Sequence, residues 1–159
     1  GDTAKITPLV PMHTLGHDFI PAPIHAGGLR YHGISPIISV LTQEKKMTTE
    51  AYSQIEVFDA AKLFLRSEGI IPAPEPSHAI KGVIDEALRC KKTGEAKTIL
   101  FVLCGHGFFD MAAYDEYFSG KLQPYEYPTQ KVAESMDKLH KLYPWLNEVN
   151  KKYIGCETY

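Results

Sequence analysis

A run of six uncharged residues, 98–103 (TILFVL), restricts the fold of this 159-residue chain more than any other feature. After its threonine the run is apolar at every position, which is typical of a strand buried on both faces inside a parallel sheet. Such a strand needs neighbours on both edges, because each buried backbone group without a partner costs about 1–3 kcal/mol. The candidate neighbours, at 6–10 and 70–71, are weak. We therefore expect an α/β fold with an incomplete sheet, whose remainder lies in hidden strands, on another polypeptide or in a part that was cut away.

Helical patterns surround this run. Helices are expected at 35–45, 53–69, 77–94 and 109–118, and from 129 to an interruption at Pro144. Ser53 and Glu56 have the spacing of a capping box, in which each residue satisfies an orphan amide at the helix start. Ser77 is expected to cap the next helix, and Gly69 and Gly94 are expected to end the two helices.

The predicted elements divide the chain into three segments. Residues 1–36 form an irregular region rich in proline and glycine, and a region of this kind is usually a functional loop. We interpret it as an active-site loop region that forms one wall of a site. Residues 37–120 would form an α/β portion, and residues 121–159 a C-terminal helical tail.

Charge and cysteine content narrow the classes of function. With 17 basic and 19 acidic side chains the formal net charge is −2, which excludes a strong polyanion-binding surface, so no nucleic acid partner is expected. No apolar run approaches the roughly 20 residues that cross a bilayer, and no basic-then-apolar leader opens the chain, so we expect no membrane partner. The three cysteines lack C-x-x-C spacing, which indicates reduced thiols in a cytoplasmic protein. Because the chain begins at Gly1, we expect it to be processed or a piece of something longer.

Two short segments carry side chains suited to chemistry. Residues 104–107 (CGHG) follow the predicted strand, and ligands of open α/β sheets bind at the carboxyl ends of strands. The flanking glycines would let the backbone approach a planar ligand, but a tight turn around a buried structural thiol explains the motif equally well. Glu75 lies between two prolines before the expected helix start, where the helix dipole favours a negative charge. It would cap the helix or, given a cationic partner, bind a ligand.

Residues 13–33 hold a further group of possible ligands. Any metal site there would have to be built from His17, Asp18, His25 and His32. Their spacing matches no compact zinc motif, so we expect no metal. A phosphate cradle at residues 27–28 is not expected either, because no strand leads into it. Histidines grouped on a loop are more often scaffolding held by hydrogen bonds.

Several of these segments resemble one known family. The similar segments are 15–19 (LGHDF), 23–33 (PIHAGGLRYHG), 68–75 (EGIIPAPE) with 77–79 (SHA), 103–107 (LCGHG) with Asp110, 119–122 (SGKL) and 125–128 (YEYP). Together they resemble the tryptophan synthase beta chain, and more narrowly its divergent second branch, over about residues 1–140. The resemblance implies the C-terminal portion of such a protein.

The resemblance implies a pyridoxal 5'-phosphate (PLP) enzyme of the fold-type II class, a three-layer sandwich with helices packed on a mainly parallel sheet that is incomplete here. Such an enzyme makes L-tryptophan from L-serine and indole by β-replacement. The family's Schiff-base lysine and phosphate cradle belong to earlier parts of its chain, and none of the 14 lysines here stands in a matching motif. We therefore assign no catalytic residue and expect the chain to be inactive without the upstream part.

The resemblance assigns four residues to the cofactor. Cys104, beside Gly105, falls where the family usually has a serine that faces the pyridine nitrogen. A neutral group there suits β-replacement, because a carboxylate would hold the ring nitrogen protonated and strengthen the electron sink. A thiol is a weaker hydrogen-bond donor than a hydroxyl group, so Cys104 departs from the pattern in the strength of that contact. Glu75 matches a glutamate lying against the cofactor, and Gly16 a glycine whose backbone passes near the ring.

The resemblance also implies substrate residues and partners. Asp18 matches an aspartate of the closed, substrate-bound form, and Phe19 an aromatic residue that borders the indole pocket. Further expected partners are a monovalent cation bound by backbone carbonyls, a second copy in a homodimer, an alpha subunit and the N-terminal remainder of the same enzyme. Two alternatives stay open: a serine deaminase of the same fold, and a non-catalytic assembly module that keeps the scaffold.

Overall fold

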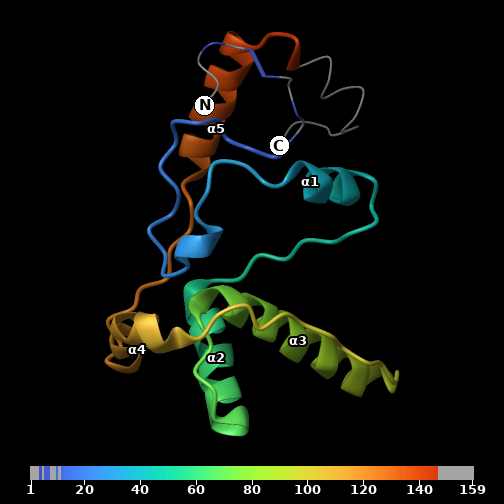
Figure 1. Ribbon diagram of the computed structural model, residues 1–159, viewed down its shortest axis with the longest axis vertical. Helices are drawn as coiled ribbons and strands as arrows, with labels where there is room; N and C mark the ends of the chain where they lie inside the picture. Colours follow the sequence, from blue (N-terminus) through green and yellow to red (C-terminus); the bar gives the residue numbers. More distant parts are fainter. Residues whose placement is uncertain (1–3, 5, 8–9, 11, 147–159) are drawn as a thin grey trace. The chain divides into compact units, whose positions relative to one another are not determined.

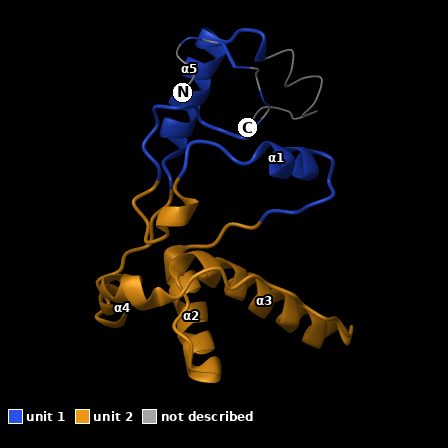
Figure 2. Ribbon diagram, in the orientation of Figure 1, with its two compact units in different colours: residues 1–21, 31–49, 127–159 blue, residues 22–30, 50–126 orange. Residues whose placement is uncertain are grey.

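The computed structural model describes residues 4, 6–7, 10 and 12–146 (Figure 1). Figure 2 shows its two compact units: unit 1 comprises residues 1–21, 31–49 and 127–159, and unit 2 comprises residues 22–30 and 50–126. Unit 1 carries helices α1 (Pro36–Gln43) and α5 (Thr129–Leu142). Unit 2 carries helices α2 (Gln54–Glu68), α3 (Pro74–Thr93) and α4 (Met111–Phe118), with the 3₁₀ turns η1 (Gly27–Leu29) and η2 (Gly107–Asp110). Within the described residues, no helix has both the length and the apolar character that crossing a bilayer requires.

An aromatic core holds unit 2 together. Helices α2 and α3 pack against each other (Figure 1), and α4 joins them through its aromatic side chains. Phe58 of α2 is 1% exposed and meets Tyr114 of α4 edge to face, with ring centroids 5.1 Å apart. Tyr117 of α4 stacks on Phe58 at 5.5 Å. Burying a side chain of this size contributes roughly 1.5–3 kcal/mol, so these contacts anchor α4 to α2.

Both ends of α2 follow the sequence prediction. The Glu56 amide donates to the Ser53 hydroxyl at 3.4 Å, and the Ser53 amide donates to the Glu56 carboxylate at 3.0 Å. This reciprocal pair is the expected capping box. Gly69 ends the helix with a φ of 70°, a left-handed conformation that glycine adopts at little cost. Helices α1 and α5 also lie at their predicted positions.

The start of α3 corrects the prediction at Ser77. The helix begins earlier, at Pro74, with Ala73 as its N-cap residue. Proline suits the first turn, because its missing N–H has no helical partner there and its φ is already helical. Ser77 therefore lies inside the helix, where it is fully buried and its hydroxyl donates to the Ala73 carbonyl at 2.7 Å. The predicted end at Gly94 is confirmed, with a φ of 75°.

The predicted strand at 98–103 is not found in the structure. Its side chains nevertheless alternate: Ile99 and Phe101 are partly buried, and Phe101 meets Phe64 of α2 with ring centroids 6.0 Å apart. Leu100, between them, is 94% exposed. A strand exists only beside a hydrogen-bonded neighbour, and no segment in the described part of the chain pairs with this one, so the parallel sheet is not confirmed.

The N-terminal region that was predicted to be irregular, residues 1–36, has little regular structure in its described part. Between residues 12 and 35 the only regular element is η1. Helix α4 begins at Met111 rather than at 109, because the turn η2 precedes it. Residues 147–159 of the predicted tail lie outside the described residues.

Candidate functional site

The turn at residues 104–107 is fixed against the start of α3. The Ala73 amide donates to the Gly105 carbonyl at 3.0 Å, and the Gly107 amide donates to the Ile71 carbonyl at 2.8 Å. The structure thus brings together the two segments that the sequence marked as suited to chemistry, although they lie far apart along the chain.

Both glycines of this turn permit the close approach. A Cβ atom on Gly107 would lie 2.6 Å from the Pro72 carbonyl oxygen, and one on Gly105 would lie 3.0 Å from the Cβ atom of Ala73. Any larger residue would push the turn away from α3. The tight-turn interpretation therefore holds for the backbone, but the thiol of Cys104 is exposed rather than buried.

Glu75 binds a backbone amide. It lies in the first turn of α3, and its Oε1 atom accepts a hydrogen bond from the Gly28 amide at 2.8 Å. A Cβ atom on Gly28 would lie 3.1 Å from the Cγ atom of Glu75, so glycine makes room for this contact. No side chain caps α3, so the carboxylate joins α3 to η1 and does not cap its own helix.

A second acidic group near Glu75 was not among the predicted site residues. Burial raises the pKa of the Asp110 carboxyl group above its usual value, and the negative charge of Glu75 raises it further. His25 opposes that rise in the pKa. The Nε2 atom of His25 lies 2.9 Å from the Glu116 carboxylate. Asp110 and His25 both belong to the segments that carry the family resemblance, which is the sequence signal that could have found them.

Gly16 and Asp18 lie in unit 1, where both contact α5. Gly16 has a φ of 101°, and a Cβ atom on it would lie 3.4 Å from Leu139. The Asp18 carboxylate forms an ion pair with Lys138. Because both side chains of this pair are about half exposed, the pair contributes at most about 1 kcal/mol. These contacts define where the loop meets α5.

Phe19 belongs to an aromatic group in the same unit. Its ring meets that of His32 at 5.0 Å and that of Tyr127 at 6.4 Å, edge to face in both cases. The Nε2 atom of His32 lies 2.9 Å from the Phe19 carbonyl oxygen, and the Tyr127 hydroxyl donates to the Ile20 carbonyl at 3.2 Å. Neither Tyr127 nor Lys138 was among the predicted site residues. Tyr127 belongs to a segment that carries the family resemblance, whereas no sequence signal links Asp18 to Lys138, which lies much later in the chain.

The predicted site residues therefore fall into two groups, one in each unit. Cys104, Gly105 and Glu75 lie in unit 2, whereas Gly16 and the two substrate residues lie in unit 1. Among the described residues, no three histidine, cysteine or acidic side chains stand close enough to hold a metal ion. Two of the histidines considered as ligands are hydrogen-bonded instead, one to a carboxylate and one to a carbonyl group.

Curated proteins supply close relatives, although no family model matches the chain. Tryptophan synthase beta chain 2 of Methanosarcina acetivorans is 66% identical over 122 residues, and that of Aquifex aeolicus is 60% identical over 122 residues. The tryptophan synthase beta chain of Thermococcus gammatolerans is 55% identical over 126 residues. These alignments cover 77–79% of this chain but only 28–29% of the relatives, so the chain spans less than a third of their length. The resemblance drawn from the motifs is thereby confirmed, and the chain is a relative of the tryptophan synthase beta chains that matches the C-terminal portion of such a protein.

Proposed function

We propose that this chain is the C-terminal part of a PLP-dependent tryptophan synthase beta-like enzyme, which makes L-tryptophan from L-serine and indole. The observation that carries the proposal is the 66% identity to the beta chain 2 of Methanosarcina acetivorans over 77% of this chain. The alternatives, a serine deaminase and an assembly module, receive no such support, because the relatives are named for tryptophan synthesis.

In this proposal the chain supplies one wall of the cofactor cleft, and the upstream part supplies the lysine and the phosphate cradle. The turn at residues 104–107 supports this role, because two hydrogen bonds to residues 71 and 73 give its side chains a fixed position. The exposed thiol of Cys104 and the absence of a side chain on Gly105 fit a flat ring that approaches the turn. PLP, when bound, supplies the electron sink for breaking and forming bonds at the β-carbon of serine.

Cys104 would donate a weak hydrogen bond to the pyridine nitrogen. As a neutral group it would place no negative charge beside the ring, which suits β-replacement. Glu75 would lie against the cofactor, with its carboxylate held by the Gly28 amide. Asp110 is the further acidic group near Glu75, and burial raises the pKa of its carboxyl group.

The substrate residues would act from unit 1. Asp18 would accept a hydrogen bond from the serine substrate, and its ion pair with Lys138 occupies only one of its two carboxylate oxygens. Phe19, supported by His32 and Tyr127, would border the indole. Gly16 would let the backbone pass close to the cofactor ring.

The fold-type II sandwich is part of the same proposal. Leu100 and Val102 are 94% and 70% exposed, which is unusual for neighbouring aliphatic side chains in one uncharged run. Strands of the upstream part would pair with residues 98–103, and its helices would cover these side chains. The homodimer, the alpha subunit, the monovalent cation, the cytoplasmic location and the division into three segments stay predictions.

A chimera tests the proposal. The upstream part of the Methanosarcina acetivorans protein is joined to this chain, which replaces the matching portion, and the unaltered relative serves as the control. We expect the chimera to show the absorption band of bound PLP and to convert L-serine and indole to L-tryptophan, whereas this chain alone does neither. A chimera that binds PLP and deaminates serine without consuming indole would contradict the proposal, as would activity of this chain alone.

A further inference from the structure

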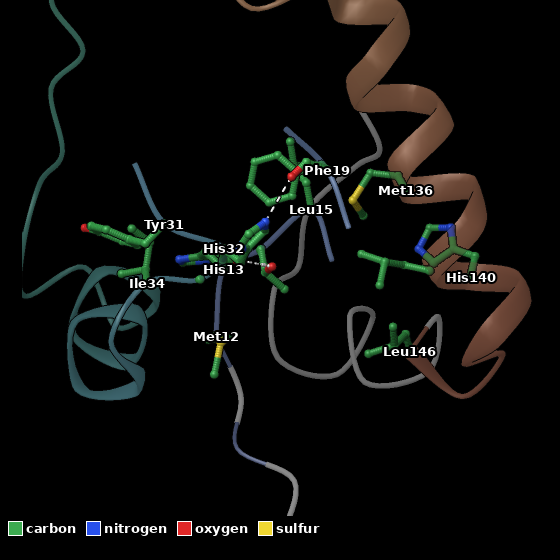
Figure 3. Close-up of a pocket in the computed structure, with 13 residues that line it drawn as sticks. Met12, His13, Leu15, Phe19, Tyr31, His32, Ile34, Met136, His140 and Leu146 are labelled. Atoms are coloured by element: carbon green, nitrogen blue, oxygen red, sulfur yellow. Dashed lines mark hydrogen bonds between the residues drawn. The ribbon is translucent and has the colours of Figure 1, made fainter. Parts of the chain in front are cut away.

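The loop that carries the predicted substrate residues has two parts. In unit 1, Phe19 and His32 line a cavity of about 500 Å³ (Figure 3), and this part already belongs to the proposed substrate site. Residues 22–30, which lie between these two residues in the sequence, belong to unit 2 and make contacts of their own. Among those contacts, the proposed function uses the hydrogen bond between Gly28 and Glu75.

The turn η1 needs support from outside its own backbone. It is three residues long, and the hydrogen bonds of short 3₁₀ turns have poor geometry. Two of its residues are Gly27 and Gly28, and glycine has more conformational freedom than any other residue. The Gly28 amide donates to Oε1 of Glu75 at 2.8 Å, so the direction of that carboxylate depends on where η1 is held.

His25, two residues before η1, is held at three points. Its amide donates to Oε1 of Gln54 at 3.4 Å, and Gln54 is only 8% exposed. Its Nε2 atom lies 2.9 Å from Oε2 of Glu116 in α4. Its ring meets that of Phe58, in the core of unit 2, edge to face with centroids 6.5 Å apart. Helices α2 and α4 therefore both fix the residue that leads into η1.

We infer that His25 is a positioning residue for Glu75. Its bond to Glu116 holds η1 in place, and the Gly28 amide of η1 then fixes the Glu75 carboxylate. The side chains of His25 and Glu116 are 38% and 49% exposed, so the bond has a modest effect. The inference rests on the proposed function, in which Glu75 lies against the cofactor, and goes further because it assigns roles to His25 and Glu116.

Solvent exchange of the Gly28 amide proton, measured by nuclear magnetic resonance on this chain, tests the inference. Glu116→Ala removes the partner of His25, and we expect the Gly28 amide to exchange about three- to tenfold faster. Asp115→Ala removes the same charge from the neighbouring position of α4 and should leave the exchange rate unchanged. An unchanged rate in Glu116→Ala would overturn the inference, as would an equal change in Asp115→Ala.

The Gly107 amide separates a local effect from a general loosening of unit 2. It donates to the Ile71 carbonyl and not to η1, so its exchange rate should stay the same in every variant. Equal acceleration at Gly107 and Gly28 would overturn the inference.

Two further variants test the bond itself. His25→Phe keeps a ring against Phe58 but removes both nitrogens, so it should speed Gly28 exchange as much as Glu116→Ala does. The double variant should add nothing further, because both changes remove one interaction. Glu116→Gln keeps a group that donates or accepts, and should restore most of the protection whichever tautomer His25 adopts. Additive effects, or a glutamine variant as fast as the alanine one, would overturn the inference.

The chimera tests what this positioning does for the cofactor. A side chain that has to be ordered on binding lowers affinity, so Glu116→Ala should raise the dissociation constant of PLP about two- to tenfold, and Asp115→Ala should not. Equal affinities would overturn the positioning role. An unaltered chimera that binds no PLP would contradict the proposed function instead, and the Gly28 exchange in this chain alone would still decide whether His25 positions Glu75.

Discussion

At the scale of single residues, hydrogen bonds between distant parts of the sequence hold the candidate cofactor wall in place. Glu75 accepts a hydrogen bond from the Gly28 amide, and the Gly105 carbonyl accepts one from the backbone just before α3. The Tyr114 hydroxyl donates to the Pro72 carbonyl at 2.6 Å. Each of these bonds ends on a buried or partly buried group at the start of α3, so the loss of any one should loosen the turn beside it.

Tyr114 should make the stability of the chain depend on alkaline pH. Burial raises the pKa of its phenol group from about 10 to about 12. Because the folded chain holds this proton more tightly than the unfolded chain, the stabilisation is complete below pH 10 and is lost as the pH rises to about 12. The free energy of unfolding, measured by urea denaturation, should fall by up to about 1.4 kcal/mol per pH unit in this window.

The control for this prediction is Tyr114→Phe. At pH 7 the variant should be less stable by about 1–3 kcal/mol, because it leaves the Pro72 carbonyl without its partner. Its stability should fall less steeply above pH 10, although the raised pKa values of Tyr52 and Tyr117 keep part of the slope. Equal slopes in the two proteins would show that Tyr114 is not the titrating group.

Gly107→Ala should destabilise unit 2. The new methyl group would meet the Pro72 carbonyl oxygen at 2.6 Å, and neither backbone can move without breaking the bond to Ile71. We expect a loss of about 1–3 kcal/mol in the free energy of unfolding, measured by urea denaturation. Gly27→Ala is the matched control, because nothing lies within 4 Å of its new methyl group. A Gly107→Ala variant as stable as this control would contradict the close packing.

At the scale of elements, local signals predicted most helix ends, the start of α3 excepted, whereas non-local pairing was not predicted. The capping box at Ser53 and the glycine that ends α2 involve only residues within one turn, so the sequence contains all the information that they need. The start of α3 was misplaced because Pro74 competes with Ser77 for the first turn, and proline is favoured there. The strand at 98–103 was not found because pairing depends on a partner elsewhere, which an apolar run cannot supply by itself.

The capping box should contribute measurably to stability. Ser53→Ala removes the acceptor for the Glu56 amide, and we expect the free energy of unfolding to fall by about 1 kcal/mol. Ser67→Ala, near the other end of α2, should change it by less than about 0.5 kcal/mol, because that exposed hydroxyl bonds only to the Leu63 carbonyl in its own helix. Equal effects of the two substitutions, in the same urea titration, would mean that the box contributes nothing specific.

The candidate site likewise has features that the sequence predicts and features that depend on the packing of distant segments. Motifs were enough to single out Glu75 and Cys104, because their residue types and flanking glycines and prolines are visible in the sequence. The sequence could not show that Glu75 binds Gly28 or that Asp18 pairs with Lys138, since these contacts depend on how distant segments pack. The sequence left open whether the Cys104 thiol is buried or faces a ligand, and the structure shows it exposed, because burial of a strand end requires the rest of the sheet.

At the scale of the whole molecule, the chain spans 28% of its relative from Methanosarcina acetivorans, and one side of the apolar run at 98–103 lies exposed. Leu100 faces away from unit 2, whereas Phe101 packs against Phe64 of α2. Side chains of this kind are normally covered in a complete protein. The proposed upstream part explains both observations, because its strands would complete the sheet and its helices would cover the exposed face.

The substitution Leu100→Ser should affect the stability of the isolated chain and that of the chimera differently. In this chain alone the substitution should change the free energy of unfolding by less than about 0.5 kcal/mol, because the side chain is 94% exposed. In the chimera it should cost about 2–5 kcal/mol, the usual cost of truncating a buried leucine. Phe101→Ser should be costly in both proteins, because its ring already packs on Phe64. A Leu100→Ser substitution without effect in the chimera would contradict the idea that the upstream part covers this face.

Amide hydrogen exchange at residues 98–103, compared between this chain and the chimera, tests the central claim most directly. If the chain is one wall of a larger enzyme, these amides should exchange freely in the isolated chain and become strongly protected in the chimera, where strands pair with them. Strong protection in the isolated chain, or free exchange in both proteins, would contradict the claim.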